Sequence, residues 1–130
     1  MNVSNATEIE KGIGSELAQF VYRVPKKNHD AMLKLCKRAA DMTRKCGAAH
    51  LVFQLNNTEV PMEGITNIAK TVSAKEVWLE LMFYRDRKHR AEAEAEMNND
   101  ESMGPLFQQS TDLVATGTGF IMGEFSRLEV

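Results

Sequence analysis

The sequence lacks the features that would assign it to several large classes of protein. No apolar run approaches the roughly 20 residues that a membrane-spanning helix requires. Its 16 lysines and arginines face 18 aspartates and glutamates, so the basic field needed for non-specific nucleic-acid binding is missing. The first residues are polar and contain no apolar stretch of the kind found in a signal peptide. We therefore expect neither a membrane nor a nucleic acid as partner.

Cysteine is scarce as well, and the spacing of the two cysteines is informative. Cys36 and Cys46 fall in one predicted helix, where a rise of about 1.5 Å per residue separates them by about 15 Å. A disulfide requires Cα atoms within about 7 Å, so we expect two free thiols. Free thiols together with the absence of an export signal predict a cytoplasmic protein.

Motifs for metal or cofactor chemistry are also absent. The histidines His29, His50 and His89 form no HxH or HExxH pattern, and neither cysteine belongs to a CxxC pair. There is no nucleophile elbow, phosphate-binding glycine loop or dinucleotide fingerprint. His89 shares a predicted helical face with Glu92 and Glu96, but glutamates are common on helix surfaces. We expect no metal and no cofactor.

What is present is a regular alternation of strand and helix patterns in a chain of 130 residues, the size of one domain. We expect a flexible N-terminal arm at 1–16 and a single domain at 17–130. Period-two and helical patterns predict strands at 17–24, 49–55, 76–84 and 120–130, helices at 26–47 and 86–98, and an irregular segment at 99–118. The βαββαβ order predicts an α+β, ferredoxin-like fold with a four-stranded antiparallel sheet and both helices on one face.

The two faces of this predicted sheet differ in composition. One parity of each strand is nearly all apolar, and we expect the helices to cover it: Ala18, Phe20, Tyr22 and Val24; Leu51, Phe53 and Leu55; Val77, Leu79, Leu81 and Phe83; Ile121, Gly123 and Phe125. The other parity is mixed and includes Val21, Val52, Trp78, Met82, Phe120 and Met122. An exposed apolar patch of this kind usually marks an interface, so we expect a homodimer that pairs sheet against sheet.

The mixed parity also holds the polar residues that could form a site. This polar barrel face, a candidate for ligand binding, comprises Arg23, His50, Trp78, Glu80, Tyr84 and Glu124. Two interpretations stay open: the charges pair across an interface, or they line a small cavity in which His50 or Glu80 would be the catalytic base. We expect Glu80 to bind a cation or donor, with Arg23 the first choice and His50 the second.

The segment "RDRKHR" at 85–90 opens the second predicted helix with positive charge, although a helix start favours acids. Asp86 is a good N-cap. Arg87, His89 and Arg90 could form an anion site with the free N–H groups of the first turn. The favoured interpretation is that these side chains reach partners on a neighbouring strand, loop or subunit.

Three segments resemble a known family: "FVYRVPKKNHDAML", "CGAAHLVFQL" and "ITNIAKTVSAKEVWLELMFYRDRKHRAEAEAEM". They are similar to the uncharacterised YbaA-like proteins of the dimeric α/β-barrel superfamily, over about residues 17–130. The resemblance implies a ferredoxin-like protomer whose sheet pairs with that of its twin, and it implies no activity. Two functions remain open, namely a homodimer that binds a small metabolite, and a cofactor-independent, monooxygenase-like or related small-molecule enzyme.

Overall fold

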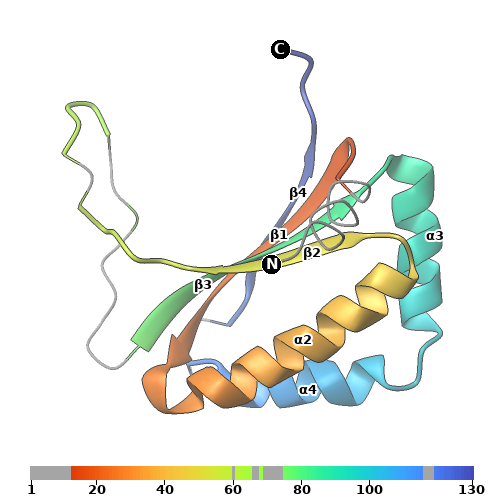
Figure 1. Ribbon diagram of the computed structural model, residues 1–130, viewed down its shortest axis with the longest axis horizontal. Coiled ribbons are helices and arrows are strands. Elements are labelled where there is room, and N and C mark those ends of the chain that lie inside the picture. Colours follow the sequence, from red (N-terminus) through yellow and green to blue (C-terminus); the bar gives the residue numbers. More distant parts are fainter. Residues whose placement is uncertain (1–12, 60, 66–67, 69–74, 116–118) are drawn as a thin grey trace, which may run out of the picture.

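The computed structural model describes residues 13–59, 61–65, 68, 75–115 and 119–130 (Figure 1). The elements in chain order are β1 (Glu16–Pro25), a single 3-10 turn η1 (Lys26–Asn28), α2 (His29–Lys45), β2 (Ala49–Gln54), β3 (Lys75–Tyr84), α3 (Arg87–Asn98), α4 (Met103–Leu113) and β4 (Ile121–Ser126). The four predicted strands and both predicted helices are confirmed. Most of the predicted N-terminal arm lies outside the described residues, and its last member, Glu16, begins β1.

The strands form one antiparallel sheet in the order β2-β3-β1-β4. The longest strands, β1 and β3, lie at its centre and pair over their full length. This order and the element sequence confirm the ferredoxin-like α+β fold predicted from the pattern.

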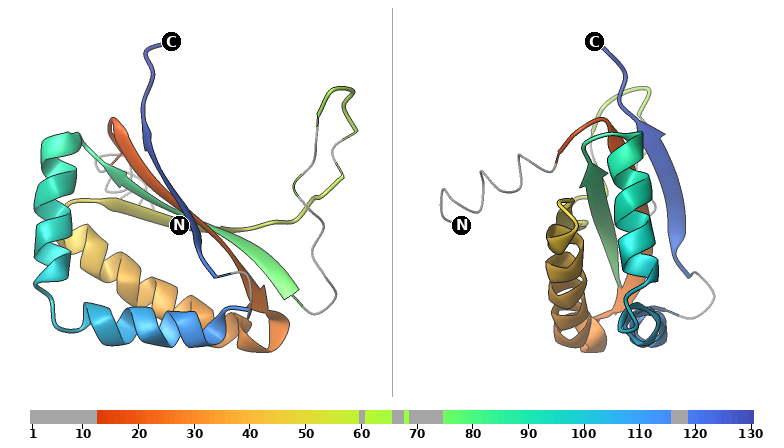
Figure 2. Two further views of the ribbon diagram at one scale, coloured as in Figure 1. Left: turned by 180° about the vertical axis from the view of Figure 1, so that it is seen from behind. Right: turned by 90° about the vertical axis from the view of Figure 1, so that its right-hand side faces the viewer.

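Helices cover one face of this sheet (Figures 1 and 2). The helices α2 and α4 run beneath the strands, whereas α3 stands at one end of the sheet. The face beneath which α2 and α4 lie carries the even-numbered residues of the strands, including Tyr22, His50 and Trp78, which are 2%, 3% and 2% exposed. We call this the inner face, and the opposite one the outer face.

The helix α4 is the main correction to the predicted elements, because 99–118 was expected to be irregular with only a short turn around Leu106 and Phe107. Gly104 and Pro105 suggested a break in the chain, yet both lie in the first turn of α4. Proline is tolerated there because its missing N–H would have no partner in the helix. Leu106 of this helix is 3% exposed and faces the core.

Two clusters of buried residues make up the core on the inner face. The first lies between β1, β3 and α2 and includes Tyr22, Val24, Met32, Cys36 and Trp78. The second packs α3 against the sheet through Ala18, Ala48, Tyr84, Ala93 and Met97. Between the first cluster and α4, the packing leaves a cavity.

Candidate functional site

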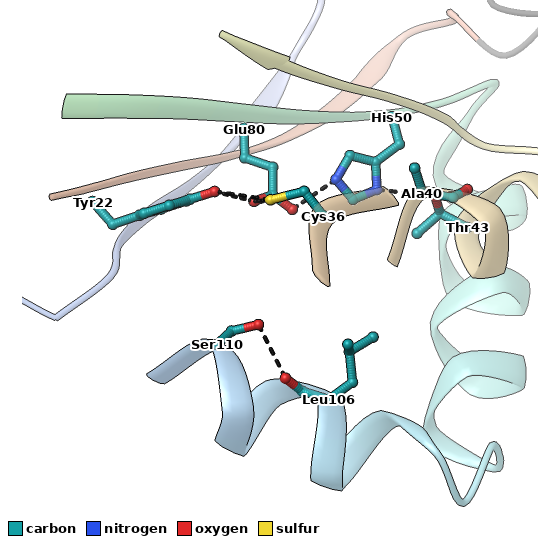
Figure 3. A network of polar contacts seen from close by, with 8 residues as sticks. All are labelled: Tyr22, Cys36, Ala40, Thr43, His50, Glu80, Leu106 and Ser110. Atoms are coloured by element: carbon teal, nitrogen blue, oxygen red, sulfur yellow. Dashed lines mark hydrogen bonds and ion pairs between the residues drawn. The ribbon is translucent and has the colours of Figure 1, made fainter. Parts of the chain in front are cut away.

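The cavity lies between the inner face of the sheet and the helices α2 and α4, and its volume is about 150 Å³. Most of its wall is apolar and comes from Phe20, Met32, Met82, Met103, Leu106 and Phe120. Its polar wall consists of Cys36, Thr43, His50, Glu80 and Ser110. In Figure 3, Glu80 and His50 extend from the sheet toward α2, and Ser110 lies across the space on α4. A small set of polar groups in an otherwise apolar pocket is the usual composition of a small-molecule site.

Glu80 and His50 form a close pair in this wall. Oε2 of Glu80 lies 2.6 Å from Nε2 of His50, and the two side chains are 15% and 1% exposed. On its other side, Nδ1 of His50 lies 3.0 Å from the Thr43 hydroxyl. That hydroxyl donates its single hydrogen to the Ala40 carbonyl, which can only accept. Nδ1 of His50 must therefore be a donor.

This hydrogen-bond count fixes how many protons the pair holds. With Nδ1 protonated, the contact between Nε2 and Oε2 needs one further proton, carried by either residue. The pair is consequently neutral as a whole, either as imidazolium and carboxylate or as imidazole and carboxylic acid. A neutral pair avoids the large cost of an isolated buried charge.

The second carboxylate oxygen of Glu80 is held by two further groups. The Tyr22 hydroxyl donates to Oε1 over 2.6 Å, and the Cys36 thiol lies 3.8 Å from the same atom. Burial raises the pKa of Glu80, but the hydrogen bond and charge of His50, with the bonds from Tyr22 and Cys36, outweigh it and lower the pKa. Burial beside this carboxylate raises the pKa of Tyr22 and raises that of Cys36 to about 12, so both stay protonated donors.

Strand register brings these groups together. Glu80 lies on β3, which is flanked by β1 and β2. Antiparallel pairing sets Glu80 opposite Phe20 on β1 and opposite Val52 on β2. Partners across a ladder share a face, so Tyr22 and His50, each two positions from these partners, reach Glu80 from both sides.

The predicted assignment of faces is correct for β1 and wrong for the other strands. His50, Trp78, Glu80 and Tyr84 lie on the inner face, whereas they were expected on the outer one. Arg23 is opposite Val77 and lines a pocket on the outer face. The first-choice partner for Glu80 is therefore wrong, since the sheet separates Arg23 from it, and the second choice, His50, is the one observed.

The other members of the predicted polar face have structural partners. Trp78 donates its Nε1–H to Glu76 over 2.9 Å, and Nδ1 of His29 lies 2.7 Å from the same oxygen. Tyr84 is 1% exposed within the cluster that packs α3. Glu124, on the edge strand β4, is 48% exposed and lies 3.6 Å from Arg90. The predicted set is thus divided: His50 and Glu80 line the cavity, Trp78 and Tyr84 lie in the two buried clusters, and Arg23 and Glu124 lie outside them.

The positive charge at the start of α3 pairs mainly with β1. Arg90 lies 3.1 Å and Arg87 3.6 Å from Glu16, a carboxylate that is only 3% exposed. This confirms the interpretation that these charges reach a neighbouring strand. Asp86 caps the helix as predicted, accepting from the His89 N–H over 2.7 Å. An anion site at these residues stays a prediction, and an anion there would compete with Glu16.

His89 connects the C-terminal end of α2 to the start of α3. Its Nε2 lies 2.6 Å from the Cys46 carbonyl at the end of α2, and its Nδ1 accepts from the Arg85 N–H over 3.1 Å. The ring is therefore neutral, with its hydrogen on Nε2. Gly47 passes close by with φ of 80°, and a Cβ there would lie 3.2 Å from Nε2. Both nitrogens of His89 serve the fold.

Four polar residues of this region were missing from the sequence-based candidates: Tyr22, Cys36, Thr43 and Ser110. Tyr22 was placed correctly on the helix-covered face, but as a core residue rather than as a donor. Once Glu80 is placed on that face, a tyrosine two positions from its partner on β1 is within reach as a donor. Ser110 could not be found, because its helix was not predicted.

Neither a metal site nor a membrane helix is found in the part of the chain that the structure describes. No group of three or more His, Cys, Asp or Glu side chains there could hold a metal ion. No helix among the described residues is long and apolar enough to cross a membrane. Cys36 and Cys46 are both free thiols, as predicted.

The fold and the cavity define a small α+β protein with a ferredoxin-like sheet and an interior site built around a neutral Glu–His pair. The chain belongs to the DUF1428 family, described as proteins of unknown function, whose family model matches residues 17–113. Its structure is similar to the crystal structure of a NIPSNAP family protein from Agrobacterium tumefaciens str. C58. That similarity has a TM-score of 0.52 and 12% identity, and it covers 90% of this chain and 89% of the other. At this identity the likeness shows the fold alone. No curated protein matches the chain.

Proposed function

We propose that this protein is a homodimer that binds a small, mostly apolar molecule in the cavity between its sheet and its helices. The observation that carries the proposal is the Glu80–His50 pair in the wall of that cavity. A sealed core would gain nothing from placing a carboxylate and an imidazole beside empty space, because burying such groups is costly. A ligand site needs a few polar groups to orient its occupant.

The size of the cavity sets the size of the ligand. A volume of about 150 Å³ is comparable to that of an engineered apolar cavity that binds benzene, at about 150 Å³. The methionines Met32, Met82 and Met103 in the wall are flexible and can adapt to an irregular occupant. We therefore expect a ligand of about the size of one substituted ring.

The dimer is supported by the outer face of the sheet. Its residues are mainly apolar, and Phe53, Ile121 and Phe125 are 49%, 66% and 48% exposed. Large exposed apolar residues gathered on one face favour an interface with another surface. A second copy presents the same surface, so two outer faces can pair about a two-fold axis. This is the sheet pairing that the resemblance to the YbaA-like proteins implies, and the free thiols support a cytoplasmic location.

A second candidate is a cofactor-independent enzyme, monooxygenase-like or related, that acts on a small molecule in the same cavity. The observation that favours it is the proton shared between Glu80 and His50, which an acid–base step could use. The lowered pKa of Glu80 makes it a weak base near neutral pH, which favours binding over proton abstraction. Turnover of a bound ligand would show that the enzyme function holds.

Light scattering on a sizing column tests the dimer, with an expected mass of twice 14.6 kDa. Ile121→Glu places a charge on the outer face and should give monomers. Met122→Glu is the matched control, because Met122 is the next residue of β4, is 51% exposed and points to the other side of the sheet. A wild-type monomer at micromolar concentration, or equal effects of the two variants, would contradict sheet pairing.

Ligand binding is tested with toluene as a probe of the cavity, by thermal shift and by changes in the methionine methyl NMR spectrum. Toluene should raise the melting temperature of the wild type and shift the methyl signals of the cavity methionines. Ala39→Leu adds apolar volume in the wall and should abolish both effects while the circular dichroism spectrum stays unchanged. If toluene affects wild type and variant equally, the cavity is not the binding site.

A further inference from the structure

The hydrogen-bond donors and acceptors in the cavity wall determine which polar groups a ligand needs in order to bind there. The Thr43 hydroxyl donates to the Ala40 carbonyl and Nδ1 of His50 donates to Thr43. The shared proton lies between His50 and Glu80. The Ser110 hydroxyl donates to the Leu106 carbonyl over 3.0 Å, within its own helix. The hydrogens of these lining groups therefore already have acceptors.

The thiol of Cys36 fits the same pattern. Its Sγ lies 3.5 Å from the Tyr22 oxygen and 3.8 Å from Oε1 of Glu80. The thiol hydrogen is therefore directed at these two oxygens and not at the cavity. A thiol is a weak donor, and the raised pKa of Cys36 keeps it protonated. The polar wall thus offers a ligand no strong donor that is free.

Acceptor capacity, by contrast, remains. A carboxylate can accept about four hydrogen bonds. Glu80 receives short ones from Tyr22 and His50, each of 2.6 Å, and a long contact from Cys36. At least one lone pair of Glu80 is left, and the side chain lines the cavity. A ligand that carries only an acceptor would find no partner here, whereas a ligand with an O–H or N–H group would.

The charge of the wall limits the choice further. The Glu80–His50 pair is neutral as a whole because it holds one shared proton, so it provides no counter-charge for an ion. The remainder of the wall is mainly apolar. Moving a charged ligand from water into such a cavity is unfavourable. The donor group must therefore belong to a neutral ligand.

The apolar wall favours a ring. Phe20, Phe107 and Phe120 contribute aromatic side chains, and the methionine thioethers make favourable contacts with aromatic edges. We propose that the cavity binds a small neutral ring compound of the phenol class, whose hydroxyl group donates a hydrogen bond to Glu80. This inference rests on the proposed function, because it names the ligand class of the same cavity.

Calorimetry with phenol and toluene tests the inference, since the two differ only in a hydroxyl or a methyl group. A hydrogen bond to a largely buried carboxylate predicts phenol binding at least about tenfold tighter than toluene binding. Benzonitrile, a ring with an acceptor but no donor, should bind no more tightly than toluene. Equal affinity for phenol and toluene, both lost in Ala39→Leu, would overturn the ligand class but leave cavity binding intact. No binding of any probe would overturn the proposed function itself.

Two variants locate the acceptor. The double variant Glu80→Leu/His50→Leu removes the pair without leaving a buried charge, so it should fold, keep toluene binding and lose the preference for phenol. Ser110→Ala removes the hydroxyl on the α4 side of the cavity and should keep that preference. If the preference instead disappears in Ser110→Ala and survives in the double variant, the hydroxyl does not bind Glu80, and the assignment is wrong.

Discussion

Replacing Glu80 by leucine is the sharpest test of the buried network, because the side chains have similar volume and only the polar groups are lost. Glu80→Leu leaves the Tyr22 hydroxyl and the His50 imidazole without their acceptor. A buried group that loses its partner costs about 1–3 kcal/mol, so two such groups cost about 2–6 kcal/mol. Removing one member of a buried ion pair costs about 3–5 kcal/mol, which agrees.

The free energy of unfolding can be measured by urea titration with tryptophan fluorescence. Trp78 is the sole tryptophan and is 2% exposed, so its emission reports unfolding of the sheet. Protein concentration is held constant, since the stability of the proposed dimer would depend on it. We expect His50→Leu to destabilise as well, and the double variant Glu80→Leu/His50→Leu to recover a large part of the loss. The coupling energy should exceed about 1 kcal/mol.

Arg23→Leu is the matched control for this cycle. Arg23 lies on the outer face, on the strand next to Glu80, but the sheet lies between the two side chains. The effects of Arg23→Leu and Glu80→Leu should therefore add to within about 0.5 kcal/mol. A stability of Glu80→Leu within about 0.5 kcal/mol of the wild type would show that the network is solvated. Coupling to Arg23 as strong as that to His50 would refute the assignment of faces.

Further predictions concern other parts of the molecule. Arg90→Met should destabilise by about 1–3 kcal/mol because it removes the nearer cation from a buried carboxylate, whereas Arg87→Met, at an 80% exposed side chain, should change the unfolding free energy by less than about 0.5 kcal/mol. The hydrogen bond to Glu76 raises the pKa of His29 in the folded protein above its ordinary 6.5. The protonated His29 therefore stabilises the fold below pH 6.5, and this stabilisation is lost as the pH rises through the pKa of His29 in the folded protein. His29→Gln should therefore flatten the pH dependence of urea unfolding above pH 6.5, and an unchanged curve would contradict this. Cys36 and Cys46, with pKa values raised by burial to about 12 and about 11, should react slowly with a thiol reagent in the native protein and completely after denaturation without reductant.

The pH dependence of the buried network has the opposite sign from that of His29. The folded pKa of Glu80 is lowered from the ordinary 4.5, so its contribution to stability is present above that pH. This contribution is lost as the pH falls from 4.5 to the pKa of Glu80 in the folded protein, because in that range Glu80 binds a proton more readily in the unfolded chain than in the folded one. Urea titrations of the wild type between pH 3 and pH 6 should therefore show a loss of stability that is smaller in Glu80→Leu/His50→Leu. Equal pH profiles for the two proteins would contradict the lowered pKa.

The order of elements could be predicted because periodicity in the sequence distinguishes strands from helices. The faces of β2, β3 and β4 could not, because both parities of these strands are rich in apolar residues, and hydropathy then does not identify the buried side. Because Glu80 and His50 are polar, the alternate residues of β3 and β2 to which they belong were expected to face away from the helices. Both residues are buried because each neutralises the other, and such a pair cannot be recognised before the register is known.

The helix α4 shows a second limit. Gly104 and Pro105 are typical of a loop, but within the first turn of a helix they leave the hydrogen-bond ladder intact. The segment forms a helix, and the packing of Leu106 against the core, which the sequence alone does not reveal, holds it there. Because α4 forms one side of the cavity, missing it also hid the cavity. The residues His50 and Glu80 could be proposed as a site, but the space in front of them could not.

The bonds from Tyr22 through Glu80 to His50 cross three adjacent strands, β1, β3 and β2, and this bears on how the sheet avoids misassembly. A shift of one residue turns every side chain of a strand to the opposite face. With apolar residues on both faces, a shifted strand would still bury much of its hydrophobic surface. It would also move His50 away and leave the Glu80 carboxylate enclosed without its proton. The polar chain thus penalises wrong registers that hydrophobic burial alone would tolerate, and it selects one strand alignment among several of similar hydrophobic free energy.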